Sequence, residues 1–157
     1  MLTDLPELPA LLPALSPATL PTPSSTSAPV VSGHGAKVLV IDDSNTIRRS
    51  AEIFLRQGGH EVLLAEDGFD ALGKVSDHDP ELIFCNILMP RLDGYQTCAI
   101  IKRNPRYAHV PVIMLSSKDG LFDRARGRMV GSQDYLTKPF TKEQLLRAVE
   151  TFRRPPG

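Results

Sequence analysis

The stretch VLVIDDS, residues 38–44, decides the fold of this chain. Four apolar residues are followed at once by two acids, Asp42 and Asp43, which is the pattern of a buried strand that runs into a polar loop. Three later apolar runs also end in polar residues: 82–85 at Asn86, 112–115 at Ser116, and 135–137 at Lys138. Because the carboxyl ends of parallel strands meet at one edge of a sheet, we expect these polar side chains to lie together.

Helical periodicity alternates with the apolar runs. Helices are predicted near 45–57, 69–76, 95–103 and 121–130, and a fifth helix follows the capping box of Thr141 and Gln144. Another strand is predicted at 62–65, and the pairs Gly58-Gly59 and Asp93-Gly94 read as a helix end and a loop. The helix at 121–130 carries Leu121, Ala125 and Met129 at a spacing of four, which indicates its apolar face.

This alternation predicts an α/β fold of one domain. Its strands are continuously apolar rather than alternating, so both faces of the sheet should be covered. Right-handed crossovers then give a five-stranded, doubly wound parallel sheet with helices on both faces. We expect it to be of the flavodoxin-like type, with strand order 2-1-3-4-5.

Residues 1–36 differ from the rest of the chain. They hold seven of the fourteen prolines, no Lys or Arg, and a Ser/Thr cluster at 24–27. Proline removes backbone donors and disfavours helix, so we predict a disordered Pro-rich tail at 1–36 and a folded domain at 37–157. A proline-rich docking segment is the alternative interpretation of the tail.

Composition excludes several classes of function. The net charge is zero, and residues 37–157 carry only +2 (18 basic minus 16 acidic), which is too weak to indicate a nucleic-acid partner. The basic run of Arg124, Arg126 and Arg128 reads as a solvated helix face. Cys85 and Cys98 should be buried free thiols. No apolar run approaches the ~20 residues of a membrane span, so we expect a cytoplasmic protein without a membrane partner.

The expected cluster of two carboxylates, an amide, a hydroxyl and an ammonium suits one chemistry. Hard oxygen ligands at neighbouring strand ends are typical of Mg²⁺, which keeps some of its waters and shares its shell with a phosphoryl group. A lysine and a short hydroxyl are suitable partners for phosphoryl oxygens. No Gly-rich loop follows the first strand, which disfavours dinucleotide and P-loop binding.

Four stretches together resemble the response-regulator receiver domain, the CheY-like family. They are VLVIDDS (38–44), LIFCNILMPRLDG (82–94), PVIMLSS (111–117) and YLTKPF (135–140), and the resemblance covers essentially all of 37–153. Within the family, IDDSNTIRRSAE, DGFDAL, MPRLDGYQTC and VIMLSSKDGLFDRARG are similar to the single-domain regulators of twitching motility.

The resemblance implies a phosphorylation site. Receivers accept a phosphoryl group from a histidine kinase, here of the CheA-like kind, onto an aspartate at the end of the third strand. Asp43 would ligate Mg²⁺ directly, Asp42 partly through water, and the backbone carbonyl of Leu88 would complete the protein ligands. Lys138 would pair with the acceptor or its phosphoryl oxygens, and Ser116 would hydrogen-bond the phosphoryl group.

The resemblance also implies a switch. Tyr135 would be the aromatic side chain that swings inward behind Ser116, and the Lys138–Pro139 bond would be cis. The output surface would comprise the fourth helix, the fifth strand and the fifth helix, and would bind a pilus-motor or regulatory protein.

Asn86 departs from the family pattern, because it stands where the acceptor aspartate belongs. An amide is not a competent nucleophile at phosphorus, so we expect no aspartyl phosphate at this position. We also expect weakened Mg²⁺ binding, with Asn86 a poor ligand, and an apo domain stabilised by the loss of like-charge repulsion. Three explanations stay open: an engineered or accidental change that locks a normal receiver off, a natural pseudo-receiver, and a deamidating Asn, which the β-branched Ile87 disfavours.

The function expected from the sequence is therefore that of a monomeric single-domain response regulator, not an enzyme. It would belong to a two-component, chemotaxis-like system that controls type IV pilus twitching motility, and it would signal by protein–protein contact. The alternative is a phosphorylation-independent adaptor. A Mg²⁺-dependent phosphatase is a third class, disfavoured because VLVIDDS lacks the second acid two residues after the nucleophile that such hydrolases use.

Overall fold

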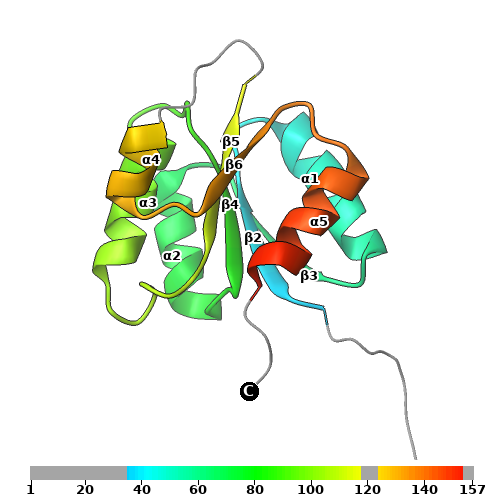
Figure 1. Ribbon diagram of the computed structural model, residues 1–157, viewed down its shortest axis with the longest axis horizontal. Helices are drawn as coiled ribbons and strands as arrows, with labels where there is room; N and C mark the ends of the chain where they lie inside the picture. The colour runs from blue at the N-terminus through cyan, green and yellow to red at the C-terminus, as the bar shows by residue number, and fades with distance from the viewer. Residues whose placement is uncertain (1–34, 118–123, 154–157) are drawn as a thin grey trace, which may run out of the picture. The chain divides into compact units, whose positions relative to one another are not determined.

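The computed structural model describes residues 35–117 and 124–153, which form a five-stranded parallel sheet with helices on both faces (Figure 1). The expectation of a disordered tail at 1–36 falls almost wholly outside the described residues. In chain order the elements are β2 (Lys37–Ile41), α1 (Asn45–Gln57), β3 (Glu61–Ala65), α2 (Gly68–His78), β4 (Leu82–Asn86), α3 (Gly94–Arg103), β5 (Val112–Ser116), α4 (Arg124–Val130), β6 (Asp134–Thr137) and α5 (Lys142–Phe152).

The strands lie in the order β3-β2-β4-β5-β6, and all four pairings are parallel. The predicted order 2-1-3-4-5 is thereby confirmed. The register sets Ile41 beside Cys85, Asn86 beside Leu115, and Ser116 beside Thr137. The carboxyl ends of the strands consequently share one edge of the sheet, from which the site is built.

Two apolar layers sandwich the sheet, because successive side chains of each strand point to opposite faces. Leu39 and Ile41 pack with α2 and α3 on one face, whereas Val38 and Val40 pack with α1 and α5 on the other. Figure 1 shows α2, α3 and α4 on one side of the sheet and α1 and α5 on the opposite side. The inner strands β4 and β5 are buried throughout, as their continuous apolar sequences predicted.

Capping residues set where the helices begin and end. Ser44 and Thr141 cap α1 and α5, and the predicted capping box of Thr141 is present. Asp93 and Gly94 were assigned to a loop, but Asp93 caps α3 and Gly94 is its first residue. A Cβ on Gly94 would lie 2.3 Å from the backbone oxygen of Asn86, so only glycine lets this helix start against the end of β4.

The predicted apolar face of α4 is wrong where the structure describes it. Ala125 is exposed and the Met129 side chain is 86% exposed, whereas Gly127 faces inward. Residues 121–123 of the predicted helix, including Leu121, lie outside the described residues. The spacing of four therefore marks the solvent side of this helix rather than its packed side.

Two further expectations can be compared with the structure. Cys85 and Cys98 are buried free thiols, as predicted, and burial raises the pKa of both, that of Cys98 to about 11. Within 35–117 and 124–153, none of the helices has the length and apolarity needed to cross a membrane.

Candidate functional site

The side chains at the carboxyl ends of β2, β4 and β6 form one hydrogen-bonded cluster. Lys138, one residue beyond β6, donates from Nζ to Oδ2 of Asp42 at 3.2 Å and to Oδ1 of Asn86 at 2.9 Å. Its side chain is only 16% exposed, and that of Asp42 is fully buried. Three strands that are not all neighbours are thus joined by one ammonium group.

The carboxamide of Asn86 completes the cluster. Its Nδ2 donates to Oδ1 of Asp43 at 3.1 Å and to the backbone oxygen of Leu88 at 2.8 Å. The orientation of the amide follows from its neighbours, because an ammonium can only donate and a carboxylate can only accept. A flipped amide would turn its NH₂ group towards Lys138 and its oxygen towards Asp43, and both contacts would be lost.

Asp42 is the buried acid of the pair. Burial raises the pKa of its carboxyl group, and the backbone N–H of Ser44, which donates to Oδ1 at 2.9 Å, and the charge of Lys138 act in the opposite direction. Asp43, by contrast, is exposed. Two adjacent acids of the sequence therefore have different environments, since Asp42 is held by a cation and Asp43 faces both the amide and solvent.

The two remaining predicted residues are Ser116, the last residue of β5, and Tyr135, in β6. Ser116 is 4% exposed and its hydroxyl donates to the carbonyl of Ser117 at 3.3 Å, while its own carbonyl accepts from the backbone N–H of Lys138 at 2.7 Å. Tyr135 is half-buried and packs against the core layer of α2 and α3. The predicted cis Lys138–Pro139 bond is present.

Sequence reasoning missed two residues that shape the site. Arg48 on α1 donates to the backbone carbonyl of Asp42 and to the side chain of Asn45, and so ties the helix to the acidic loop. Gly94 allows the close approach of α3 to Asn86. A glycine immediately after a capping acid was the available signal for the second residue, whereas nothing local singled out Arg48 among neighbouring arginines.

The oxygen atoms at this edge are of the kind that binds Mg²⁺, but they already accept hydrogen bonds within the domain. Carboxylate and carbonyl oxygens are the ligands that Mg²⁺ prefers. Here the Asp42 carboxylate accepts from Lys138, and the Asp43 carboxylate and the Leu88 carbonyl both accept from Asn86. Among the described residues no group of three or more His, Cys, Asp or Glu side chains is placed to hold a metal. The residues present do not fit a tight Mg²⁺ site.

Comparison with known proteins identifies the class to which this fold and cluster belong. The sequence profile of the response regulator receiver domain matches residues 38–150, and the chain belongs to this family. The resemblance seen in the sequence is thus confirmed. Receiver domains are signalling domains.

Two relatives and one solved structure show more specific similarities within this family. The chain is 64% identical over 116 residues to the protein PilG of Pseudomonas aeruginosa, a match that covers 74% of this chain and 86% of PilG. It is 34% identical over 114 residues to PilH of the same organism, covering 73% of this chain and 94% of PilH. Among solved structures, the chemotaxis protein CheY4 of Vibrio cholerae has a TM-score of 0.71 at 31% identity, over 75% of this chain and 98% of CheY4.

Proposed function

We propose that this protein is a single-domain response regulator of a two-component, chemotaxis-like system that controls type IV pilus twitching motility. It acts in the cytoplasm as a monomer and signals by protein–protein contact. Membership of the receiver family and the 64% identity to PilG support this assignment. So does the resemblance of the regions around Asp42, Met89 and Ser116 to twitching-motility regulators.

The partners that we propose are of the kinds that receiver domains bind. A CheA-like histidine kinase would dock at the carboxyl edge of the sheet, and a pilus-motor or regulatory protein would bind the surface of α4, β6 and α5. The side chain of Met129 on α4 is 86% exposed, which offers that surface an apolar contact. Half-buried Tyr135 on β6 lies between this surface and the core, where a rotation of its ring would alter both.

Asn86 determines how the protein would signal. Its amide is held by Lys138 on one side and by Asp43 and the Leu88 carbonyl on the other. The resemblance of LIFCNILMP to the family pattern aligns Asn86 with the acceptor aspartate. An amide oxygen has no full charge with which to attack phosphorus. The protein as it stands would therefore take no phosphoryl group at this position. The single observation that carries the proposed function is the match of residues 38–150 to the receiver family.

The same contacts weaken Mg²⁺ binding. Receiver domains generally bind Mg²⁺ at their phosphorylation site, where Asp42, Asp43 and the Leu88 carbonyl would hold it and the ion would neutralise the incoming phosphoryl oxygens. In this chain an ion would displace the NH₂ group of Asn86 from two of those oxygens without gaining a third carboxylate. At ~4 Å and an effective dielectric of ~20, one missing charge pair is worth about 4 kcal/mol before desolvation.

A phosphorylation-independent adaptor is the second candidate. One observation favours it: the carboxamide of Asn86 makes three hydrogen bonds within the domain, so the carboxyl edge has internal partners in the absence of any ligand. A domain held in one state in this way would signal through binding alone.

Intact mass after exposure to acetyl phosphate and Mg²⁺ tests the proposal. The unaltered protein should gain nothing, and the Asn86→Asp variant should gain one phosphoryl group that is lost at alkaline pH. Asn104→Asp, which adds a carboxylate at an exposed position, is the matched control and should gain nothing.

The remaining outcomes separate the alternatives. No gain in Asn86→Asp would favour the adaptor, because restoring the acceptor would then not restore the chemistry. A gain in the unaltered protein would contradict the assignment of Asn86 to the acceptor position.

A further inference from the structure

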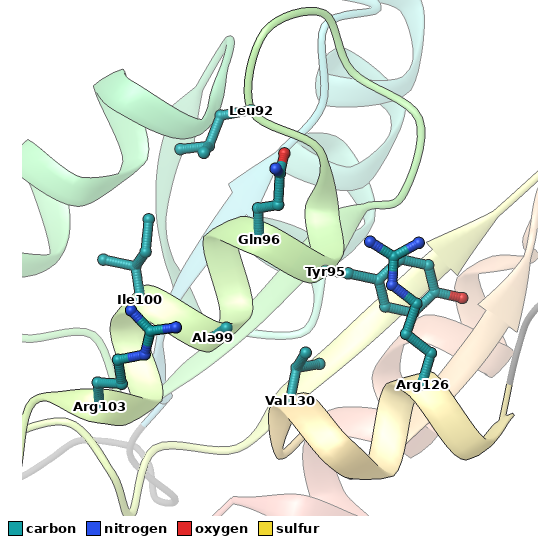
Figure 2. Close-up of a pocket in the computed structure, with 8 residues that line it drawn as sticks. All are labelled: Leu92, Tyr95, Gln96, Ala99, Ile100, Arg103, Arg126 and Val130. Carbon is teal, nitrogen blue, oxygen red and sulfur yellow. The ribbon is translucent and has the colours of Figure 1, made fainter.

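A second surface of the domain has the features of a docking site, and it is separate from the carboxyl edge of the sheet. A groove of ≈ 310 Å³ runs between α3 and α4 (Figure 2). The α3 wall is formed by Gln96, Ala99, Ile100 and Arg103, and the spacing of three, four and seven residues puts them on one outward face of the helix. That face is not covered by another element of the described chain.

The floor of the groove is apolar. Leu92, Ala99 and Val130 line it and are partly buried, and the side chain of Ile100 is 38% exposed. Solvent contact at these side chains is unfavourable and would be removed by an apolar side chain of a partner. Figure 2 shows Ala99 and Val130 between the two arginines that line the groove, with Ile100 beside Arg103.

Each end of the groove carries a guanidinium group. Arg126 of α4 lies 4.4 Å from the ring centroid of Tyr95 and 3.7 Å from the carboxylate of Asp93, with 51% of its side chain exposed. Arg103 is exposed at the other end, in the last turn of α3. Stacking on Tyr95 pre-orients Arg126, so that less entropy is lost when it pairs with a second carboxylate.

Charge selects the partner that fits this groove. Arg103 and Arg126 are the charged residues among those that line the groove, and the nearby carboxylate of Asp93 pairs with Arg126. A basic ligand would be repelled, and an uncharged one would offer Arg103 and Arg126 no further carboxylate. The complementary surface is acidic at both ends and apolar in the middle.

We propose that the α3–α4 groove binds an amphipathic α-helix of a partner protein that carries two acidic residues two helical turns apart, with apolar residues between them. Tyr95, beside Arg126, and Arg103 are eight residues apart on α3, which corresponds to about 12 Å along the axis. Two acids about seven residues apart on a partner helix span about 10 Å and match this separation. The surface is independent of Asn86, so it would serve with or without phosphorylation.

Binding of designed peptides to the full-length protein tests this proposal. The probe is a helix-stapled peptide with Glu at two positions two turns apart and Leu between them, followed by fluorescence anisotropy and by amide chemical shifts. A peptide with Lys in place of both Glu is the control. We expect the acidic peptide alone to bind, with shifts concentrated on α3 and α4.

Charge reversal then distinguishes a direct contact from a structural effect. Arg103→Glu should weaken binding of the acidic peptide about tenfold, as expected for a well-placed arginine at an interface. A peptide with Lys at the facing position should restore it. Arg49→Glu, an exposed arginine on α1 in the opposite helical layer, is the matched control and should leave the affinity unchanged.

Four results would overturn the proposal. They are equal binding of the acidic and basic peptides, no binding of either, shifts centred on β6 and α5, and an affinity insensitive to Arg103→Glu. A second copy of this chain is the other occupant to test, and sedimentation equilibrium measures self-association. Self-association that is abolished by Arg103→Glu would show that a second copy fills the groove instead of a partner helix.

Discussion

The two ends of the sheet both use polar side chains in hydrogen bonds, but they do so in different ways. At the amino ends of β2 and β3, His60 accepts from the backbone N–H of Ala36 at 2.9 Å, and Lys37 donates from its backbone to Glu81 and from its side chain to the carbonyl of His78. Each of these bonds joins a side chain to the backbone. They hold the start of the sheet in one conformation.

At the carboxyl end three central bonds join one side chain to another. Lys138 bonds Asp42 and Asn86, and Asn86 bonds Asp43. Such bonds are a minority of about 10–15% in folded proteins, and they can be exchanged for bonds to a ligand without moving the backbone. The bonds at the amino end therefore fix the backbone, whereas these three bonds at the carboxyl end fix side chains relative to one another.

The largest expected effect is that of removing the shared cation. Lys138→Met should lower the free energy of unfolding by about 3 kcal/mol at neutral pH, because it leaves the buried carboxylate of Asp42 without its partner. Urea denaturation measures the loss. The double variant Asp42→Asn, Lys138→Met should recover most of it, and equal losses in both would show that the pair is not coupled.

Magnesium gives the next effect. At about one hundred times its dissociation constant, Mg²⁺ should stabilise Asn86→Asp by about 2.7 kcal/mol. The unaltered protein should respond far less at the same concentration, because the Asn86 amide already satisfies Asp43 and the Leu88 carbonyl. Without Mg²⁺ the unaltered protein should melt at the higher temperature. Thermal melts with Ca²⁺-free MgCl₂ test both, and identical responses would contradict the comparison between the two ends.

The smallest effect is a pH dependence at the amino end. Burial lowers the pKa of His60, and the charge of Arg153 lowers it further, against the opposing charges of Glu150 and Glu81. Well above pH 6.5 the histidine is neutral in both the folded and unfolded chains. As the pH falls below about 6.5, the unfolded chain takes up the proton first, so this contribution to stability is progressively lost.

Denaturation between pH 7.5 and 5.5, a range set about the ordinary histidine pKa of ~6.5, measures this loss, which is about 1.4 kcal/mol for each unit of difference in pKa between the two states. His60→Gln should flatten the dependence over this range. His109→Gln, at an exposed position, should leave it unchanged. If the free energy of unfolding of the unaltered protein did not change over this pH range, protonation of His60 would not destabilise the folded state, and the prediction would be wrong.

Much of the fold could be predicted because its signals are local. Continuous apolar runs gave β4 and β5, and the capping box at Thr141 gave the start of α5. The prediction failed for α4, where the spacing of Ala125 and Met129 satisfies helical periodicity but lies on the exposed side. Periodicity shows that a helix has an apolar face, and it does not show what that face contacts.

The site could be predicted as a set of residues but not as a set of bonds. Strand ends in a parallel sheet must share an edge, and this rule alone predicts that Asp42, Asp43, Asn86 and Lys138 lie together. The direction of the Asn86 amide depends on which neighbours can only donate and which can only accept. That information exists only once Lys138 lies between Asp42 and Asn86.

The sequence by itself determined the order of strands and helices along the chain and the chemistry available at the strand ends, which includes an amide rather than a carboxylate at Asn86. These are properties of residue type and spacing along the chain. Only the tertiary structure decided that Lys138 pairs with Asp42, 96 positions away, and that a groove with an arginine at each end lies between α3 and α4. The physical reason is that burial forces polar groups to find partners by proximity in space, for which the linear sequence has no local signal.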